Sequence, residues 1–499
     1  MSPTNASRIV AAIYPLLRSW GAKNMMDILG YIVVLCPILT LITLGMAGLL
    51  HFPLSEKFVD RWTKFNVTMG LAASIAILAV MLWNQAGIHV VNFGNFVAID
   101  EEHFHFHIQF VFDRLSIPMV IMSFVLVGVI GSFANVYLQG DAGYYRFFVC
   151  FSMFLVGLLF AFLAGTIETL FLGWELVGLS SALLIAYFHE RTAPVQNGLR
   201  VWAFYRVADA AFLAAAITMH HLTGEGDFAK LTGDMPWPEG TSQLLDPWSS
   251  FFVGLLLLVA AAGKSGLIPF SGWLPRAMEG PTPSSAVFYG ALSIHLGAYL
   301  LLRVSPILSA SIPLRICVVL LGGATAIFAA ATARVQTDVK SALAYSSVCQ
   351  VGIIVVEIGL GWWYLALIHM IGHAFLRSLQ LLRAPTLLRD YRTMENAIGG
   401  RLVQGPFWAS STESGSSQTR WYRFMLERGY MDSIIDLLTD RPFCRLFRFF
   451  ERMEDRWMRL LSGEKETSRF DPSESPNLNT PRTPNLEPNL ATASEGASS

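Results

Sequence analysis

Ionisable side chains within long apolar stretches are the feature of this sequence that could perform chemistry. Glu175 lies near the middle of the apolar run 169–188, and Lys264 lies within the run 248–274. A charged side chain near the centre of a bilayer costs about 2.5–3.5 kcal/mol on insertion scales, so it usually faces the protein interior and has a partner. Burial favours neutral lysine, whereas a nearby carboxylate favours the ammonium form. A Glu175–Lys264 couple could therefore take up and release a proton.

Two features of the neighbouring residues bear on the same chemistry. Arg206 and Asp209 are three residues apart in one apolar run. They therefore share a helix face and can neutralise each other, although such pairs also serve packing alone. Pro269 follows Lys264 and removes a backbone donor, which predicts a broken helix. Broken helices in membranes line cavities or pack within protein.

A second polar series lies farther along the chain. His369, His373 and Arg377 recur every four residues, so they form one stripe on a helix. Histidine titrates nearest to physiological pH and suits a proton relay, whereas arginine keeps its proton and can only polarise one. Asp338 and Lys340 stand at the entrance of the preceding apolar run. We predict as relay residues Glu175, Lys264, Lys340, His369 and His373, with Arg206, Asp209, Asp338 and Arg377 as supporting charges.

Two further residues have open roles. Glu357 lies near the far end of the run 341–360, where it either extends the polar axis or is solvated at the membrane surface. His295 is a lone histidine in an apolar run, and such a residue more often serves packing than function.

The loop between the second and third apolar runs, residues 87–113, alternates apolar and polar residues. This period is typical of a β-strand and predicts a short hairpin. His103, His105 and His107 belong to the alternation and could bind a metal, but no carboxylate spacing fixes a geometry. We therefore predict no metal site.

The composition places the chain in a membrane. Hydrophobic residues make up 54% and charged residues 14% of the 499 residues, far from a soluble composition. A bilayer core about 30 Å thick needs roughly 20 apolar residues per helix. This template predicts an all-α polytopic membrane protein with eleven spans: 28–50, 67–83, 115–138, 147–166, 169–188, 201–220, 248–274, 284–302, 316–333, 341–360 and 362–382.

Positive charges in the short loops predict the orientation. An N-terminus outside places most of them on the cytoplasmic side, together with the tail after Arg383: Lys57, Arg61, Lys64, Arg146, Arg191, Arg200, Arg276, Arg334 and Lys340. The opposite side collects Arg114, Lys230, Arg303 and Arg315.

We divide the chain into four parts. Residues 1–27 are expected to form an interfacial segment and residues 28–384 the transmembrane proton-conducting domain. Residues 385–461 show helical amphipathicity and residues 462–499 the composition of a disordered tail. The five cysteines fit no disulfide, iron–sulfur or zinc spacing, and no glycine-rich nucleotide fingerprint is present. We expect no cofactor and no catalytic redox site in this chain.

These residues sit in motifs that resemble the antiporter-like subunit 5, or bacterial subunit L, of respiratory complex I. The same family includes the large subunit of multisubunit cation/proton antiporters. The resemblance covers roughly residues 113–382 and rests on residues 173–180 (GWELVGLS), 206–209 (RVAD), 264–265 (KS), 273–286 (WLPRAMEGPTPSSA), 336–340 (QTDVK), 344–347 (AYSS) and 369–375 (HMIGHAF).

The resemblance implies two inverted five-helix repeats, each with a broken helix, and a proton relay along a central axis. By motif, Glu175 resembles the essential glutamate of the family and Lys264 its broken-helix lysine. Lys340 resembles the central connecting lysine, and His369 and His373 resemble the linking histidines.

The sequence departs from the family pattern at three places. Tyr289 stands where the family usually has histidine, and Arg377 where it usually has lysine. After Leu382 a polar sequence follows in place of the second broken helix and the closing helix, which predicts an incomplete second repeat. The stripe of His369, His373 and Arg377 would then face lipid or an open seam unless a partner covered it.

We interpret the chain as a proton-translocating, non-redox subunit of a complex I-like NADH:quinone oxidoreductase. A membrane subunit of a cation-flux-driven bicarbonate or CO2 uptake complex is one alternative. A cation/proton antiporter subunit and a non-conducting scaffold are two others. The expected partners are other membrane subunits, protons or other small cations and the lipid bilayer, with no nucleic acid, in a bacterial cell (inner) membrane.

Overall fold

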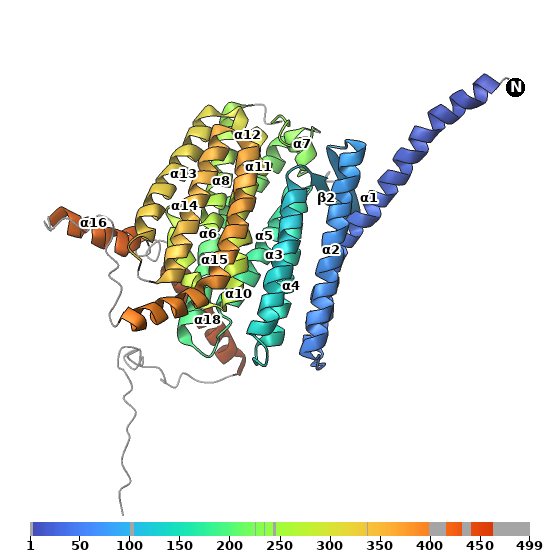
Figure 1. The fold of residues 1–499 in the computed structure, drawn as a ribbon. Helices are drawn as coiled ribbons and strands as arrows, with labels where there is room; N and C mark the ends of the chain where they lie inside the picture. The colour runs from blue at the N-terminus through green and yellow to red at the C-terminus, as the bar shows by residue number, and fades with distance from the viewer. Residues whose placement is uncertain are drawn as a thin grey trace, which may run out of the picture. The chain divides into compact units, whose positions relative to one another are not determined.

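Long apolar helices dominate the computed structural model, which describes residues 3–99, 104–224, 226–233, 235–242, 246–336, 338–398, 416–431 and 441–462. Within these residues eleven helical stretches are long and apolar enough to cross a membrane. They coincide with the eleven predicted runs, so the all-α polytopic architecture is confirmed (Figure 1). The chain is a multi-pass membrane protein.

The helices of the first half are α1 (Pro3–Leu49), α2 (Glu56–Asn84), α3 (Ser116–Tyr137), α4 (Tyr144–Leu163), α5 (Ile167–Ile185), α6 (Thr192–Thr223) and α7 (Phe228–Thr232). Those that follow are α8 (Pro247–Ser265), α9 (Trp273–Arg276), α10 (Thr282–Ser285), α11 (Leu296–Arg303), α12 (Ser305–Ala310), α13 (Ile312–Ala333), α14 (Val339–Leu360), α15 (Trp363–Ile398), α16 (Ser416–Leu426) and α18 (Arg441–Ser462).

The seventh span is broken, as predicted from its proline. Helix α8 ends at Ser265. The next residue, Gly266, adopts the left-handed conformation with φ 64°, which glycine tolerates best. Pro269 and a 3-10 turn (Phe270–Gly272) then lead into α9. The indole of Trp273 donates to the Gly263 carbonyl at 3.0 Å, so this side chain bridges the break in the span.

The eighth span is irregular in a way that the sequence did not predict. Between α10 and α11 the chain forms a π-helix (Ala286–Leu292) and a 3-10 turn (Ser293–His295). Single π turns inside helices change the direction of the side chains that follow. The irregular stretch ends at His295, one residue before the start of α11.

Small residues allow two pairs of neighbouring helices to approach closely. A side chain at Gly157 or Gly173 would meet the backbone of the facing helix in the α4–α5 pair. Gly322 and Gly352 occupy the same situation in the α13–α14 pair. Close backbone approach at small residues is a common basis of helix association in membranes.

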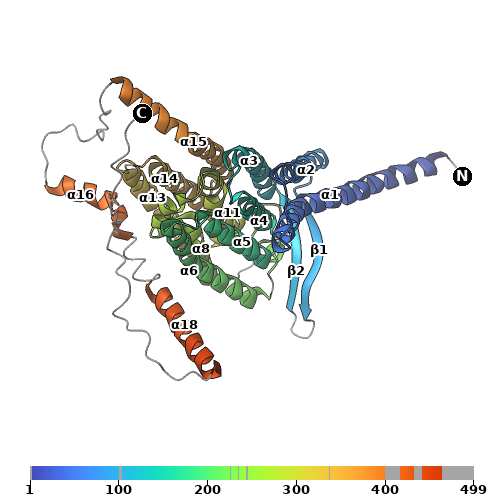
Figure 2. The same ribbon diagram turned by 90° about the horizontal axis from the view of Figure 1, so that it is seen from below.

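The predicted hairpin is confirmed. Strand β1 (Ile88–Ile99) pairs antiparallel with β2 (Phe104–Asp113), with Ile88 opposite Asp113 (Figure 2). At its base, His89 Nε2 lies 2.9 Å from Asp27 Oδ1 on α1. His103 and the side chain of His105 lie outside the described residues, so the metal question at this hairpin is untested.

The ends of the chain bear on the remaining domain predictions. Helix α1 continues from Pro3 into the first span without interruption, and its placement at a membrane surface stays a prediction. The chain divides into two compact units, Met1–Phe443 and Cys444–Ser499. The second contains most of α18, whose arginines recur along one face. Residues 463–499, predicted as a disordered tail, lie outside the described residues.

Candidate functional site: a polar axis through the helix bundle

A guanidinium group lies between the two carboxylates of the fifth and sixth spans. Arg206 NH2 is 2.6 Å from Glu175 Oε2 and 2.7 Å from Asp209 Oδ2. The Arg206–Asp209 pair on α6 was predicted from its spacing, and the structure adds Glu175 from α5. Asp209 is 5% exposed at its side chain, whereas Glu175 is 26% exposed.

Lys264 is completely buried beside this group, but it is not bonded to Glu175. Its ammonium donates to the Trp174 carbonyl at 2.8 Å and lies 4.9 Å from the Trp174 ring and 4.4 Å from the Tyr205 ring. Among the described residues no carboxylate lies within 4.0 Å of this ammonium. The expected Glu175–Lys264 couple is therefore indirect, because Arg206 reaches Glu175 from the facing helix.

Trp174 connects the lysine to the carboxylates. Its carbonyl accepts from Lys264, and its indole N–H donates to Asp209 Oδ1 at 2.6 Å. The sequence placed Trp174 only next to Glu175, and nothing in its spacing showed that its two polar ends face different helices. Trp174 and Tyr205 are the residues of this cluster that sequence reasoning missed.

His295 contacts the stripe of α15. Its Nε2 lies 2.9 Å from His373 Nδ1, and its Nδ1 bonds the Ala291 carbonyl. Because a carbonyl only accepts, His295 Nδ1 carries a proton and His373 Nδ1 donates to His295. The Nε2 of His373 is then a buried acceptor without a partner among the described residues. The interpretation of His295 as a packing residue alone missed this contact.

The three residues of the stripe on α15 bond different partners. His369 bonds Glu357 and Gln350 on α14, His373 bonds His295, and Arg377 donates to Ser346 at 2.9 Å and to Gln380 at 2.8 Å. His373 and Arg377 are each 5% exposed. The expectation that this stripe faces lipid or an open seam is wrong for His373 and Arg377, because α14 and the irregular eighth span cover them. The side chain of His369 is 25% exposed.

Glu357 is 8% exposed and therefore buried. Of its two open interpretations, the solvated surface residue is excluded.

Asp338 and Lys340 lie at the start of α14, as predicted. Asp338 Oδ2 accepts from the backbone N–H of Ser341 at 2.8 Å, so it caps the helix. Lys340 is partly buried, and the acidic groups whose charges act on it are Asp338 and Glu279. Glu279 belongs to the turn that follows the broken seventh span.

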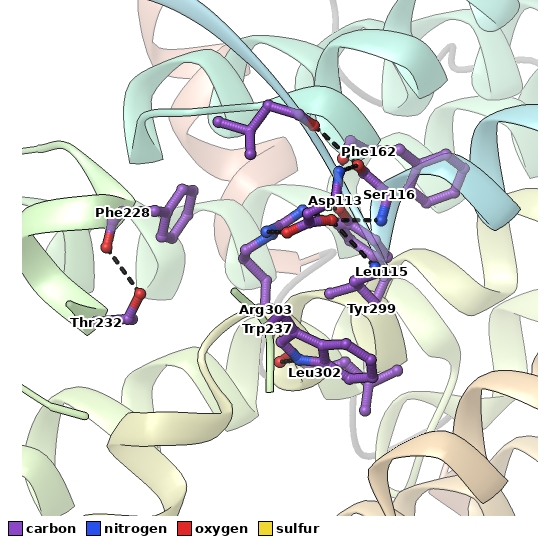
Figure 3. A network of polar contacts seen from close by, with 11 residues as sticks. Asp113, Leu115, Ser116, Phe162, Phe228, Thr232, Trp237, Tyr299, Leu302 and Arg303 are labelled. Atoms are coloured by element: carbon purple, nitrogen blue, oxygen red, sulfur yellow. Dashed lines mark hydrogen bonds and ion pairs between the residues drawn. The ribbon is translucent and has the colours of Figure 1, made fainter. Parts of the chain in front are cut away.

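A separate buried ion pair lies beneath the hairpin. Arg303 NH1 is 2.5 Å from Asp113 Oδ2, and Arg303 NH2 donates to Tyr299 at 2.7 Å. Figure 3 shows Asp113 also accepting from the backbone of Leu115 and Ser116 at the start of α3. Arg303 was expected among the loop charges, but it is 7% exposed, because it forms an ion pair with Asp113 at the end of β2.

Within the described ranges, no group of three His, Cys, Asp or Glu residues could hold a metal ion.

Comparisons with known proteins show which protein families the sequence resembles. Residues 164–406 match the family described as NADH:quinone oxidoreductase/Mrp antiporter, TM. Residues 99–148 match the N-terminus of NADH-ubiquinone oxidoreductase (complex I) chain 5. The NADH-ubiquinone oxidoreductase chain 5 of Cryptococcus neoformans var. grubii is 30% identical over 405 residues, which are 80% of this chain and 60% of that protein.

Two solved structures show the same fold. The Mrp complex from Dietzia sp. DQ12-45-1b gives a TM-score of 0.59 at 23% identity, covering 75% of this chain and 38% of that chain. An archaeal respiratory membrane complex, the membrane-bound sulfane sulfur reductase, gives a TM-score of 0.60 at 16% identity, covering 75% and 73%.

Residues 164–406 are thus similar to the family described as NADH:quinone oxidoreductase/Mrp antiporter, TM, and the fold agrees with that of the Mrp complex. The sequence also resembles chain 5 of NADH-ubiquinone oxidoreductase. The chain spans 60% of the length of the Cryptococcus relative.

Proposed function

We propose that this chain is a proton-translocating membrane subunit of a complex I-like NADH:quinone oxidoreductase, without a redox centre of its own. The observation that carries the proposal is the environment of Lys264. Its ammonium is held by a carbonyl and two aromatic faces, which are uncharged partners. Arg206 occupies the two nearby carboxylates.

This arrangement makes the charge of Lys264 sensitive to small movements. With Arg206 on Glu175 and Asp209, burial of Lys264 favours release of its proton. When Arg206 moves away from either carboxylate, the freed negative charge favours protonated Lys264. A displacement of α5 against α6 would therefore load or unload the lysine.

The proposed path continues from Lys264 to the histidines. The Tyr205 ring lies under the ammonium, and its hydroxyl faces Ser293. Ser293 stands two residues before His295, which bonds His373. These residues bring polar groups near one another between the broken helix and α15, and we include Lys340 as a further relay residue. The hydroxyl groups of Tyr205 and Ser293 make no hydrogen bond among the described residues, so a proton would need a small movement or a water molecule to pass between them.

Partners and orientation belong to the proposal. We infer that other membrane subunits assemble with the chain, that protons or other small cations move through it, and that the N-terminus lies outside and the tail in the cytoplasm. The positive charges of the short loops support this orientation. The assignment to a bacterial inner membrane gains no support from the Cryptococcus relative, which is fungal.

The test is proton flux in the native complex, purified with its partners and reconstituted in liposomes. Glu175→Gln keeps volume and hydrogen bonding but removes the charge that Arg206 neutralises, so flux should be lost while the complex still assembles. Glu190→Gln, an exposed acid with a side chain 70% accessible, is the matched control and should leave flux unchanged. Wild-type flux in an assembled Glu175→Gln complex would overturn the proposal.

A further inference from the structure

The end of the α14–α15 pair holds a buried carboxylate–histidine contact that the proposed path has not used. Glu357 Oε1 lies 2.9 Å from His369 Nδ1, and His369 Nε2 lies 3.0 Å from Gln350 Oε1. Glu357 and Gln350 both belong to α14, so one face of that helix holds the imidazole from two sides. Figure 1 shows α14 and α15 side by side over this stretch.

The charge of Glu357 has one partner. Among the described residues its only ion pair is with His369, and its second oxygen, Oε2, is buried without a hydrogen bond. The nearest cation on the neighbouring helix α13, Arg315, donates instead to the Gly359 carbonyl at 2.9 Å. A buried carboxylate in this situation is stable as an anion mainly when the imidazole carries a proton.

Gln350 allows the imidazole to exist in either state. When His369 is charged, both ring N–H groups find acceptors, the Glu357 carboxylate and the Gln350 amide oxygen. When His369 is neutral, a half turn of the amide presents its NH2 group to the bare ring nitrogen. The site therefore binds one proton without leaving a buried polar group of the imidazole unsatisfied.

Exposure sets this contact apart from the rest of the stripe. The side chain of His369 is 25% exposed and that of Glu357 is 11% exposed. One helical turn farther along α15, His373 is 5% exposed and bonds His295. The buried row of histidines thus reaches the surroundings of the bundle at His369.

We propose that Glu357, His369 and Gln350 form a proton-exchange site at this end of the path, an inference that rests on the proposed function. A proton taken from water is held as the imidazolium–carboxylate pair. It then returns to water or passes along α15 to the unpartnered Nε2 of His373. The Gln350 amide turns as the imidazole changes its charge, and the proton is the only species transferred.

The experiment compares Glu357→Gln with Glu175→Gln in the reconstituted native complex. Glu357→Gln should lower proton flux at least about a hundredfold, the low end of what a positioned acid or base contributes to a proton transfer. Glu239→Gln, an acid with a side chain 55% exposed, is the matched control and should retain full flux. Gln350→Met, which keeps volume but removes the amide, should also lower flux.

A spectroscopic measurement provides a readout independent of flux. Infrared difference spectra between acidic and neutral pH should contain a carboxylate band that shifts with the charge of the adjacent imidazole. This band should disappear in Glu357→Gln and persist in Glu239→Gln. Full flux and an unchanged band in Glu357→Gln, with flux lost in Glu175→Gln, would overturn this site and leave the proposed function standing. Full flux in both variants would overturn both the exchange site and the proposed function. If Glu357→Gln does not assemble, full flux in Gln350→Met overturns the exchange site.

Discussion

At the scale of residues, the polar axis separates fixed charges from charges that can change. Arg206 and Arg303 are ion-paired with carboxylates, and guanidinium groups keep their protons in proteins. Lys264 is held by neutral groups. A proton relay needs this arrangement. A permanent cation neutralises the carboxylates, and the lysine beside it can release its proton.

The exchange of Lys264 for arginine tests this distinction. Lys264→Arg keeps the positive charge but cannot release a proton, so it should reduce flux nearly as much as Lys264→Ala. Flux is measured in reconstituted complexes whose subunit content is first shown to be unchanged. If Lys264→Arg supports flux, Lys264 serves as a fixed charge and not as a relay station.

The sequence was sufficient to name these charged residues and to pair Arg206 with Asp209 on one helix, but not to find the contacts between helices. The free-energy cost of a charged side chain in the membrane is enough to identify Glu175 and Lys264 as unusual, because charges are rare in apolar runs. The side chains of facing helices that contact one another depend on how each helix is rotated and on irregular turns. The contact of His295 with His373 follows a π-helix, and no periodicity in the sequence marked that turn.

At the scale of elements, helix pairs are held by close backbone contact at glycine. A Cβ at Gly322 would lie 2.7 Å from the Gly352 carbonyl oxygen, whereas a Cβ at the adjacent Gly323 meets only a Val356 methyl at 3.9 Å. The two positions share one helix and differ in what they face. They therefore separate the effect of packing from that of helix propensity.

Gly322→Ala should destabilise the complex by about 1–3 kcal/mol, the usual cost of overpacking. Gly323→Ala should be neutral or slightly stabilising, because alanine favours helix more than glycine does. Thermal unfolding of the two purified variants provides the comparison. Equal melting temperatures would show that the α13–α14 pair adjusts without cost.

The hairpin is attached to α1 by a contact that depends on pH. Burial lowers the pKa of His89, and the carboxylate of Asp27 partly offsets this effect, while Lys23 adds to it. The folded state therefore favours neutral His89 more than the unfolded state does. Its contribution is complete above the ordinary histidine pKa of about 6.5 and is lost as pH falls below that value.

Amide hydrogen exchange of β1 should consequently be faster, relative to intrinsic rates, at about pH 5 than at pH 7.5. His89→Gln, which cannot titrate, should remove the pH dependence. Exchange in α4 provides the internal control, because His89 does not contribute to it. Unchanged protection of β1 across this range would show that His89 titration does not affect the hairpin.

At the scale of the whole molecule, hydropathy was sufficient to locate the eleven spans found among the described residues. Each span needs its own apolar length, so this information is local. The packing of the spans is not local. The prediction of exposure failed for His373 and Arg377 because it counted missing neighbours along the chain, whereas α14 and the eighth span supply the cover.

Within residues 363–382 of α15, the large exposed side chains are apolar and point to a partner in the membrane. Ile368, Leu376 and Leu379 are 67%, 53% and 53% exposed, and Ile368 is next to the partly exposed His369. A charged imidazole at a lipid boundary costs several kcal/mol less when protein or water covers it. We therefore predict that a partner subunit packs against this face of α15.

Cysteine cross-linking tests the contact in native membranes, after replacement of the five native cysteines. Ile368→Cys should cross-link to another subunit, whereas Ile217→Cys on α6, with a similar exposure of 62%, is the matched control and should cross-link less. The chain expressed alone should not conduct protons, because the exchange site would lack its cover. Proton flux through purified monomer in liposomes would show instead that the helices described here form a complete path by themselves.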